Sequence, residues 1–223
     1  MQKVRHVIVF ALALLLANMA LSPSSNAQDT AEATPVAEVE APLDDSAARL
    51  VIGEFHTQLL DIMRRSDELG HDGRAEALYP ILNAGMNVKA LGVGAVGKRA
   101  WGEWSEEQQE QFIESFTRFM YATYAARFNT FNDQQFHLLG TRAGPRGSII
   151  VQTELRHPNN PPTNLTYLMI HRDDRWGIAD IFLDGAVSEV AMRRSEYSSV
   201  LKAEGFEGLL AAIEENTQNR ATP

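Results

Sequence analysis

Apolar residues recur at helical spacing from Ser46 onward, where the chain first shows a regular pattern. The first helix of about four turns carries one apolar face, made by Leu50, Val51, Phe55, Leu59 and Ile62. The glycines at positions 70 and 73 interrupt the pattern. A shorter helical stretch is expected over residues 74–82, followed by a less regular, Gly-rich segment over residues 86–96.

The clearest helix signal begins at Ser105. Ser105 and Gln108 have the spacing of a capping box, in which each side chain bonds the backbone N–H of the other residue. The next residues place bulky side chains on one face, namely Phe112, Phe116, Phe119, Met120 and Tyr124. Such a stripe is usually plain core, and its periodicity does not distinguish the wall of a cavity from the filling of a core.

The pattern then changes from helical to alternating. Four short runs predict β-strands over residues 135–141, 148–156, 164–172 and 175–183. Turn-forming residues separate these runs at 144–147, 157–162 and 173–174. Four successive strands with short connections predict an antiparallel meander.

Each predicted strand offers one apolar side. Ile149, Val151, Thr153 and Leu155 share a face of the second strand, and Leu165, Tyr167 and Met169 share a face of the third. Helical periodicity returns over residues 188–204, with Gly205 as a left-handed stop before a last helix that holds Leu209, Leu210 and Ile213. The sequence therefore predicts an α+β fold with helices packed on one face of a four-stranded antiparallel sheet.

Residues 1–27 have the pattern of a cleaved secretory signal. Lys3 and Arg5 precede an apolar run over residues 7–17, and Ser25-Asn26-Ala27 offers a small-residue cleavage site. A membrane anchor needs about 20 apolar residues, and this run is interrupted at Asn18. Residues 28–45 are expected to be a disordered acidic leader, residues 46–217 a single domain, and residues 218–223 a flexible tail.

Charge and cysteine content narrow the possible partners. The formal net charge is −9, and loss of residues 1–27 removes two basic residues and no acid, which leaves −11. Such a balance argues against nucleic acid and against standing attraction to anionic headgroups, since both recruit clustered Lys and Arg. The chain has no Cys, which excludes disulfides, thiol chemistry and an acylated lipoprotein N-terminus.

No motif carries a convincing catalytic or metal centre. Residues 92–97 match GxGxxG, but no strand precedes them and the next clear helix starts at Ser105, so a structural bend or helix end is the better interpretation. The histidines are not spaced as metal ligands on one helix, and no GxSxG nucleophile motif is present. The acidic pairs at 106–107 and 173–174 fit helix-cap and turn positions.

An ordered set of segments in the last third resembles the MlaC family, also called the toluene-tolerance family. These segments are RWGIADI at 175–181, DGAVS at 184–188, RRSEY at 193–197 and GFEGL at 205–209. The resemblance extends upstream to about residue 50. Where typical members have a Gly-Val-Ser unit, this chain has Gly185-Ala186-Val187-Ser188, and with the run at 188–194 this resembles the hopanoid-biosynthesis-associated branch.

The resemblance implies a periplasmic lipid carrier, without enzyme activity or cofactor, that shuttles phospholipid or a hopanoid-type lipid. Its implied partners are an inner-membrane ABC transporter complex and an outer-membrane lipoprotein complex. The implied fold is a twisted sheet with helices around an apolar cavity. The best lining candidates are Phe112, Phe116, Phe119, Met120, Tyr124, Val151, Leu155, Leu165, Tyr167, Met169, Trp176 and Ile178.

Two other functions remain open at this stage. A periplasmic small-molecule enzyme would need polar groups that converge inside the cavity, and the predicted strand faces show few. A scaffold or interaction protein would have a filled core and no cavity.

Overall fold

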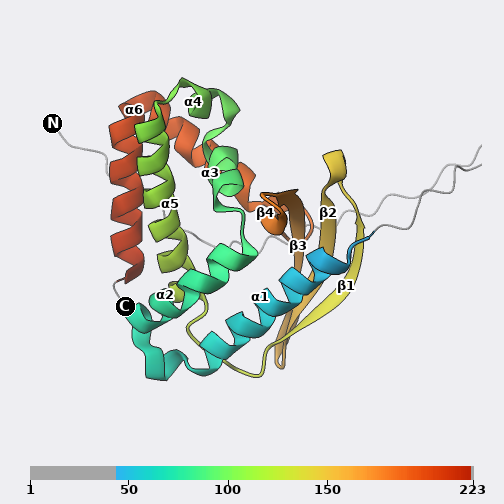
Figure 1. The fold of residues 1–223 in the computed structure, drawn as a ribbon. Coiled ribbons are helices and arrows are strands. Elements are labelled where there is room, and N and C mark those ends of the chain that lie inside the picture. The colour runs from blue at the N-terminus through green and yellow to red at the C-terminus, as the bar shows by residue number, and fades with distance from the viewer. Residues whose placement is uncertain (1–43, 222–223) are drawn as a thin grey trace, which may run out of the picture. The chain divides into compact units, whose positions relative to one another are not determined.

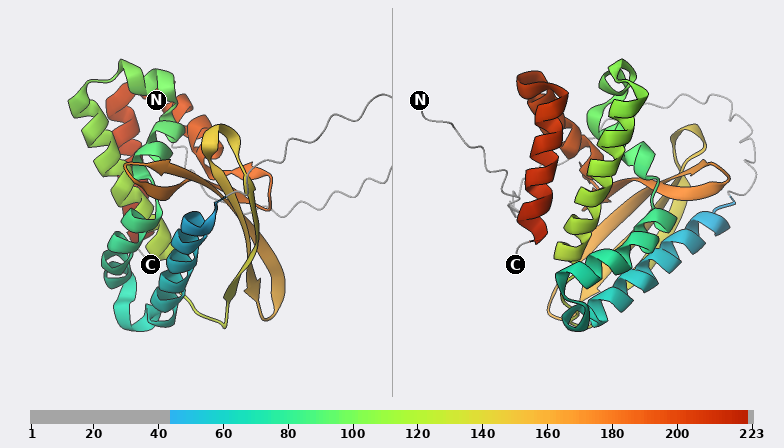
Figure 2. Two further views of the ribbon diagram at one scale, coloured as in Figure 1. Left: turned by 45° about the vertical axis from the view of Figure 1, so that its right-hand side comes forward. Right: turned by 60° about the vertical axis from the view of Figure 1, so that its left-hand side comes forward.

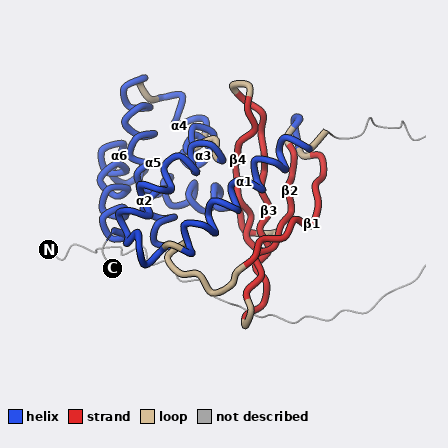
Figure 3. Tube along the Cα trace, turned by 60° about the horizontal axis from the view of Figure 1, so that its bottom comes forward, coloured by secondary structure: helices blue, strands red, loops and turns tan. Residues whose placement is uncertain are grey.

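Helices lie against one twisted antiparallel sheet in the computed structural model, which describes residues 44–221. Figure 1 shows helix α1 crossing the sheet, and helices α5 and α6 side by side away from the strands. The other views show the same separation between the strands and the α5–α6 pair (Figures 2 and 3). The predicted signal and nearly all of the predicted leader lie outside the described residues.

The first four helices precede the aromatic helix. They are α1 (Ser46–Arg64), α2 (Ser66–Gly85), α3 (Val88–Val96) and α4 (Lys98–Glu103). The stretch predicted over 74–82 is the later part of α2, which contains a non-helical residue at Gly70 (φ 61°). The Gly-rich segment forms the regular helix α3, and α4 has too few residues to show a period in the sequence.

Helix α5 (Glu106–Arg127) begins as the sequence predicts. Ser105 Oγ accepts a bond from the Gln108 backbone N–H at 3.2 Å, and Gln108 Oε1 accepts one from the Ser105 N–H at 3.1 Å. The capping box is therefore confirmed. All five residues of the bulky stripe are buried.

The sheet has five strands within the described residues, so the prediction of four was short by one. In chain order and in space they are β1 (Gln135–Ala143), β2 (Ile149–His157), β3 (Asn160–Arg172), β4 (Arg175–Leu183) and β5 (Val187–Ser188). A two-residue strand shows no alternation in the sequence. It forms because Asp184 and Gly185, both at positive φ, reverse the chain and bring Val187 opposite Leu183.

One predicted turn was also too long. The turn expected over 157–162 consists of Pro158 and Asn159 alone, and β3 already starts at Asn160, so it includes Pro161 and Pro162. The turn at Asp173-Asp174 is confirmed, and both residues adopt positive φ, as a tight two-residue hairpin requires.

The buried face of the sheet follows the predicted alternation on β2 and β3, with Ile149, Val151, Tyr167 and Met169 all buried. Strand β4 departs from strict alternation. Leu168 pairs with Asp180 while Met169 pairs with Ile178, so Ala179 is an extra residue, a β-bulge. The bulge places Ile181, opposite Tyr167, on the same face as Ile178.

Helix α6 (Glu189–Ala221) begins next to Asp180, a buried acidic residue on β4. Asp180 accepts hydrogen bonds from the Ser188 hydroxyl and the Val190 N–H, at 2.6 and 3.2 Å. Gly205 breaks the helix (φ 71°), as predicted. The second half continues to Ala221, so residues 218–221 of the predicted tail are helical. None of the helices in residues 44–221 is both long and apolar enough to span a membrane.

The glycines of the GxGxxG match allow close packing of α3. A Cβ added at Gly94 would lie 2.6 Å from Cγ1 of Val190 on α6, and one at Gly92 would lie 2.9 Å from Cδ1 of Ile113 on α5. Gly97 ends the helix at φ 83°. The structural interpretation of this motif is confirmed.

A buried polar pair joins α1 to the sheet. His56 Nε2 and Tyr167 Oη lie 2.9 Å apart, and the His56 ring stacks on Phe136 with centroids 3.8 Å apart. Burial lowers the pKa of His56 to about 3. The ring therefore stays neutral in the folded protein at any pH near neutrality.

We expect Gly94→Ala to destabilise the fold by about 1–3 kcal/mol, because the stiff Val190 side chain cannot move aside without a shift of α6. The measurement is the free energy of unfolding in urea. Gly102→Ala is the matched control, since its Cβ would meet nothing within 4 Å, and it should leave stability unchanged or slightly raised. Equal stability of both variants would contradict the close approach of α3 and α6.

We also expect His56 to make stability fall with acidification. The unfolded chain takes up a proton below about pH 6.5, whereas folded His56 does so only near pH 3. Stability is therefore full above about pH 6.5 and is lost progressively below it, by about 3 kcal/mol at pH 4.5. The free energy of unfolding in urea, measured at pH 6.5 and at pH 4.5, should fall less between these two values in His56→Gln than in wild type. The control His171→Gln, at an exposed position, should show the same fall as wild type. An unchanged loss in His56→Gln would refute the assignment.

Candidate functional site

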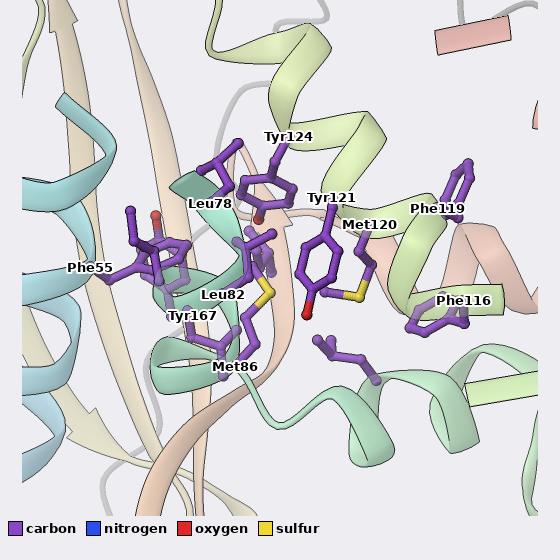
Figure 4. Packing of buried hydrophobic residues seen from close by; sticks show 14 of the residues in the cluster. Phe55, Leu78, Leu82, Met86, Phe116, Phe119, Met120, Tyr121, Tyr124 and Tyr167 are labelled. Carbon is purple, nitrogen blue, oxygen red and sulfur yellow. The ribbon is translucent and has the colours of Figure 1, made fainter. Parts of the chain in front are cut away.

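A small, mainly apolar pocket lies where α3, α5, β4 and α6 meet. Its volume is about 50 Å³. The lining residues are Met86, Leu91, Ala95, Phe116, Phe119, Met120, Thr123, Tyr124, Ile181, Glu189, Val190 and Arg193. Figure 4 shows how Phe116, Phe119, Met120 and Tyr124 project from α5, with Met86 across from Met120 and Tyr121.

The structure divides the twelve predicted lining residues into three groups. Phe116, Phe119, Met120 and Tyr124 line the pocket. Five others are buried core residues that do not reach it, namely Phe112, Val151, Tyr167, Met169 and Ile178. The last three, Leu155, Leu165 and Trp176, are only partly buried.

Phe112, the first residue of the bulky stripe on α5, belongs to the filled core and does not line the pocket. Its ring lies 5.3 Å from Trp104, 5.6 Å from Phe116 and 6.3 Å from Tyr197, measured between centroids. Aromatic neighbours and helix α3 thus enclose Phe112, and its exposure is 0 %. The pocket begins further along α5.

The hollow expected between the aromatic helix and the inner face of the sheet is mostly occupied by buried side chains. What remains open lies between α5 and the helices α3 and α6, with β4 at one side. Its volume is far below the roughly 300–1,000 Å³ typical of ligand sites. An acyl chain does not fit this conformation unless lining side chains move.

Sequence reasoning missed eight of the lining residues. Ile181 was missed because strict alternation from Ile178 would place Asp180 on the inner face, and only the bulge at Ala179 puts Ile181 there. Glu189, Val190 and Arg193 were missed because they follow the turn to α6, whose direction depends on β5 and the Asp180 bonds. The i,i+4 spacing of Glu189 and Arg193 indicates only an ion pair along one helix, whereas Glu189 bonds to Arg127 and Arg193 bonds to Glu196.

The charges at the pocket are paired or shielded. Arg127 Nη1 donates to Glu189 Oε1 at 2.9 Å, which joins the end of α5 to the start of α6. Burial raises the pKa of Tyr124 well above its ordinary value, and the neighbouring Glu189 raises it further. Tyr124 is therefore neutral. Arg193, which lines the pocket, lies over the Phe119 ring, 4.5 Å from its centroid.

The pocket lining is mainly apolar, and its polar members are Thr123, Tyr124, Glu189 and Arg193. It holds no His, Ser, Lys or Asp, and among residues 44–221 no group of three His, Asp or Glu side chains is placed to hold a metal ion. A wider, open surface groove of about 720 Å³ lies along α1 and β1, and its lining combines the apolar side chains of Leu50 and Leu138 with polar residues such as Glu54.

A solved structure is similar in fold over most of the chain. It is that of the phospholipid-binding protein from Ralstonia solanacearum in complex with a phospholipid, at 1.53 Å resolution. The TM-score is 0.68 with 18% sequence identity, and the alignment covers 80% of this chain and 98% of that one. A search of the curated proteins finds no match.

A family model matches residues 54–215, and its description is MlaC protein. The match begins in α1 and ends in the second half of α6, so it includes the whole sheet and every helix that lines the pocket. It spans well over half of the chain. The chain therefore belongs to the MlaC protein family.

Proposed function

We propose that this protein binds the acyl chains of a lipid in the pocket between α5, α3 and α6 and carries the lipid between membranes. The observation that carries the proposal is a pocket walled by Phe116, Phe119, Met120 and other apolar side chains, in a member of the MlaC family. The phospholipid held by the similar Ralstonia solanacearum protein supports it.

Lipid binding requires the pocket to widen. The lining includes Met86 and Met120, whose unbranched side chains change rotamer readily. The second half of α6, beyond the break at Gly205, covers α5 as a separate helical segment. Side-chain rotation together with a small shift of that segment would open space along α5.

The energetics favour a carrier over free diffusion. Each methylene withdrawn from water contributes about 0.8 kcal/mol, so two chains of about sixteen carbons represent on the order of 25 kcal/mol. Because a bilayer and an apolar pocket are similar solvents, transfer between them is nearly neutral once the path is shielded from water. The direction of transfer is then set by the membrane partners.

The location, cargo and partners in this proposal are supported by the sequence. The N-terminal signal pattern supports a periplasmic location, and the resemblance in the last third supports phospholipid or a hopanoid-type lipid as cargo. It also supports exchange with an inner-membrane ABC transporter complex and an outer-membrane lipoprotein complex.

The small pocket volume favours one competing function, a scaffold whose core is filled. The two functions differ in what the purified protein contains. A carrier taken from the periplasm holds lipid in a fixed ratio, whereas a scaffold holds none. Native mass spectrometry of the protein released from the periplasm separates them.

We expect Phe116→Asp to abolish lipid retention, because it places a charge in the pocket wall, where the native side chain is only 5 % exposed. Leu139→Asp is the matched control, since Leu139 lies on β1 and is 55 % exposed. Circular dichroism checks that both variants fold, and native mass spectrometry measures bound lipid. The conservative variant Phe116→Leu should keep its lipid. Folded Phe116→Asp with stoichiometric lipid would refute the proposed site.

We further expect transfer of lipid to membrane-bound partners to slow as salt rises. The protein is acidic, with a formal charge of −11 once residues 1–27 are removed. At physiological ionic strength, attraction to basic partner surfaces is largely screened beyond about 8 Å, and this distance shortens as salt is added. The measurement is the rate of fluorescent-lipid transfer at low and high salt. Rates that do not change with salt would count against electrostatic docking.

A further inference from the structure

Strand β1 forms one edge of the sheet, and among the described residues it pairs with β2 alone. An edge strand leaves the backbone N–H and C=O groups of its outer side without a strand partner, and proteins usually keep such an edge short, cover it or place charges on it. This edge is nine residues long and includes Leu138 and Leu139, which are 44 % and 55 % exposed. An extended peptide can pair with an edge of this kind.

A β-bulge accounts for the exposure of two consecutive leucines. In the register with β2, Leu138 lies opposite Thr153 and Gly140 lies opposite Gln152, so Leu139 is an extra residue. Thr153 is buried, which places Leu138 on the inner face of the sheet, the face to which α1 is joined. The exposure of Leu138 therefore shows that α1 leaves part of this face uncovered beside the edge.

Helix α1 runs alongside β1 and contacts it at two points. The Thr141 hydroxyl donates to Asp45 at the start of the helix, and the Phe136 ring stacks on His56 further along it. At the usual rise per residue of a helix and a strand, the segments 45–56 and 136–141 each span about 16 Å. The two segments therefore lie side by side and antiparallel (Figure 1).

The open groove lies between these two contacts. It is lined by Leu138 of β1 and, on α1, by residues that include Leu50, Gly53 and Glu54. A Cβ added at Gly53 would meet nothing within 4 Å, so the groove has room there for a side chain. A strand added to β1 would alternate its side chains between the two faces of the sheet, and those on the inner face would enter the groove.

The charges at the groove favour a basic occupant. The charged lining residues are Asp45, Arg49 and Glu54. Arg49 pairs with Asp45, with Nη1 and Oδ2 3.8 Å apart, whereas Glu54 is exposed and forms no ion pair within residues 44–221. The groove therefore keeps one net negative charge, in a chain whose formal charge is −9. A second copy of this chain would bring further negative charge against it, so a segment with Lys or Arg is the complementary occupant.

We propose that this groove binds an extended basic segment of another protein, which adds as a strand to the outer edge of β1. Apolar side chains at alternate positions of that segment fill the groove between Leu50 and Leu138, and a Lys or Arg pairs with Glu54. Backbone hydrogen bonds to β1 supply affinity, and the groove supplies selectivity. The groove shares no lining residue with the pocket at α5, so the interaction does not depend on lipid binding there.

The test uses three synthetic peptides with the length of β1, nine residues. The first alternates lysine and valine, the second alternates glutamate and valine, and the third is the first with every backbone nitrogen methylated, which removes the donors that strand pairing needs. Fluorescence anisotropy measures the binding of each labelled peptide to the protein without residues 1–27, at low salt. The first peptide should bind about tenfold more tightly than either of the others, because charge complementarity and backbone pairing both contribute.

Gly53→Leu fills the groove and leaves the backbone of β1 unchanged. Leucine favours a helix more than glycine does, so the variant should fold, and its affinity for the lysine peptide should fall about tenfold. Gly102→Leu is the matched control, because Gly102 is also helical with nothing within 4 Å of an added Cβ, and it should bind as wild type does. Circular dichroism checks the fold of both variants.

Leu50→Lys gives a second test of the same groove. Leu50 is 63 % exposed, so the change should not disturb the core. The added positive charge should lower the affinity for the lysine peptide about threefold and leave the glutamate peptide bound no less tightly. This variant decides the outcome if Gly53→Leu does not fold.

Glu54→Gln tests the charge that selects the partner. Its affinity for the lysine peptide should fall about threefold, as expected for one partly exposed ion pair. Glu110→Gln removes the same charge from an exposed position on α5 and should bind as wild type does. An equal loss in both variants would show only long-range attraction and would overturn the pairing with Glu54.

The remaining outcomes decide the proposal as a whole. Equal affinity for the lysine and glutamate peptides would contradict a basic partner, and full affinity for the methylated peptide would exclude strand addition. Equal binding by Gly53→Leu and Gly102→Leu would place the peptide outside the groove. Analytical ultracentrifugation without peptide provides the last arm. A dimer that Gly53→Leu dissociates would assign the groove to a second copy and overturn the proposal, whereas a monomer supports it.

Discussion

The packing of α5 against its neighbours is the constraint on which the rest of the structure depends. Aromatic rings on its buried face lie in three environments, namely two filled regions of the core and the pocket between them. Phe112 is enclosed by Trp101, Trp104 and Tyr197, and Tyr124 contacts Phe55 of α1 edge-on, with centroids 6.3 Å apart. Between these two filled regions lies the pocket. The helix therefore acts as the core of the fold at both ends and as the wall of the pocket between them.

Local patterns predicted much of this arrangement. The capping box at Ser105, the buried stripe on α5 and the inner faces of β2 and β3 could all be read from residue spacing, because each depends on a single element and its period. The break at Gly205 could be read as well, since positive φ favours glycine. The fifth strand was not predictable from spacing, because two residues have no period.

The residues opposite the aromatic helix could not be predicted from local patterns, because their positions depend on interactions between distant segments. The bulge at Ala179 reverses which β4 residues face inward, and no spacing rule indicates that an extra residue is present there. The position of Arg193 depends on how Asp180 and Ser188 orient the start of α6. The sequence could therefore identify the helix that carries the aromatic wall, whereas the residues opposite that wall required three-dimensional information.

The break at Gly205 also has a consequence for the spacing of residues along α6. The helix reaches the Phe119 ring twice, once through Arg193 before the break and once through Arg220 after it. Each helical residue advances the side-chain direction by about 100°. An insertion or deletion of one residue between positions 206 and 219 would therefore rotate Arg220 away from the ring while leaving Arg193 in place. The length of this segment therefore determines whether both arginines reach the same ring.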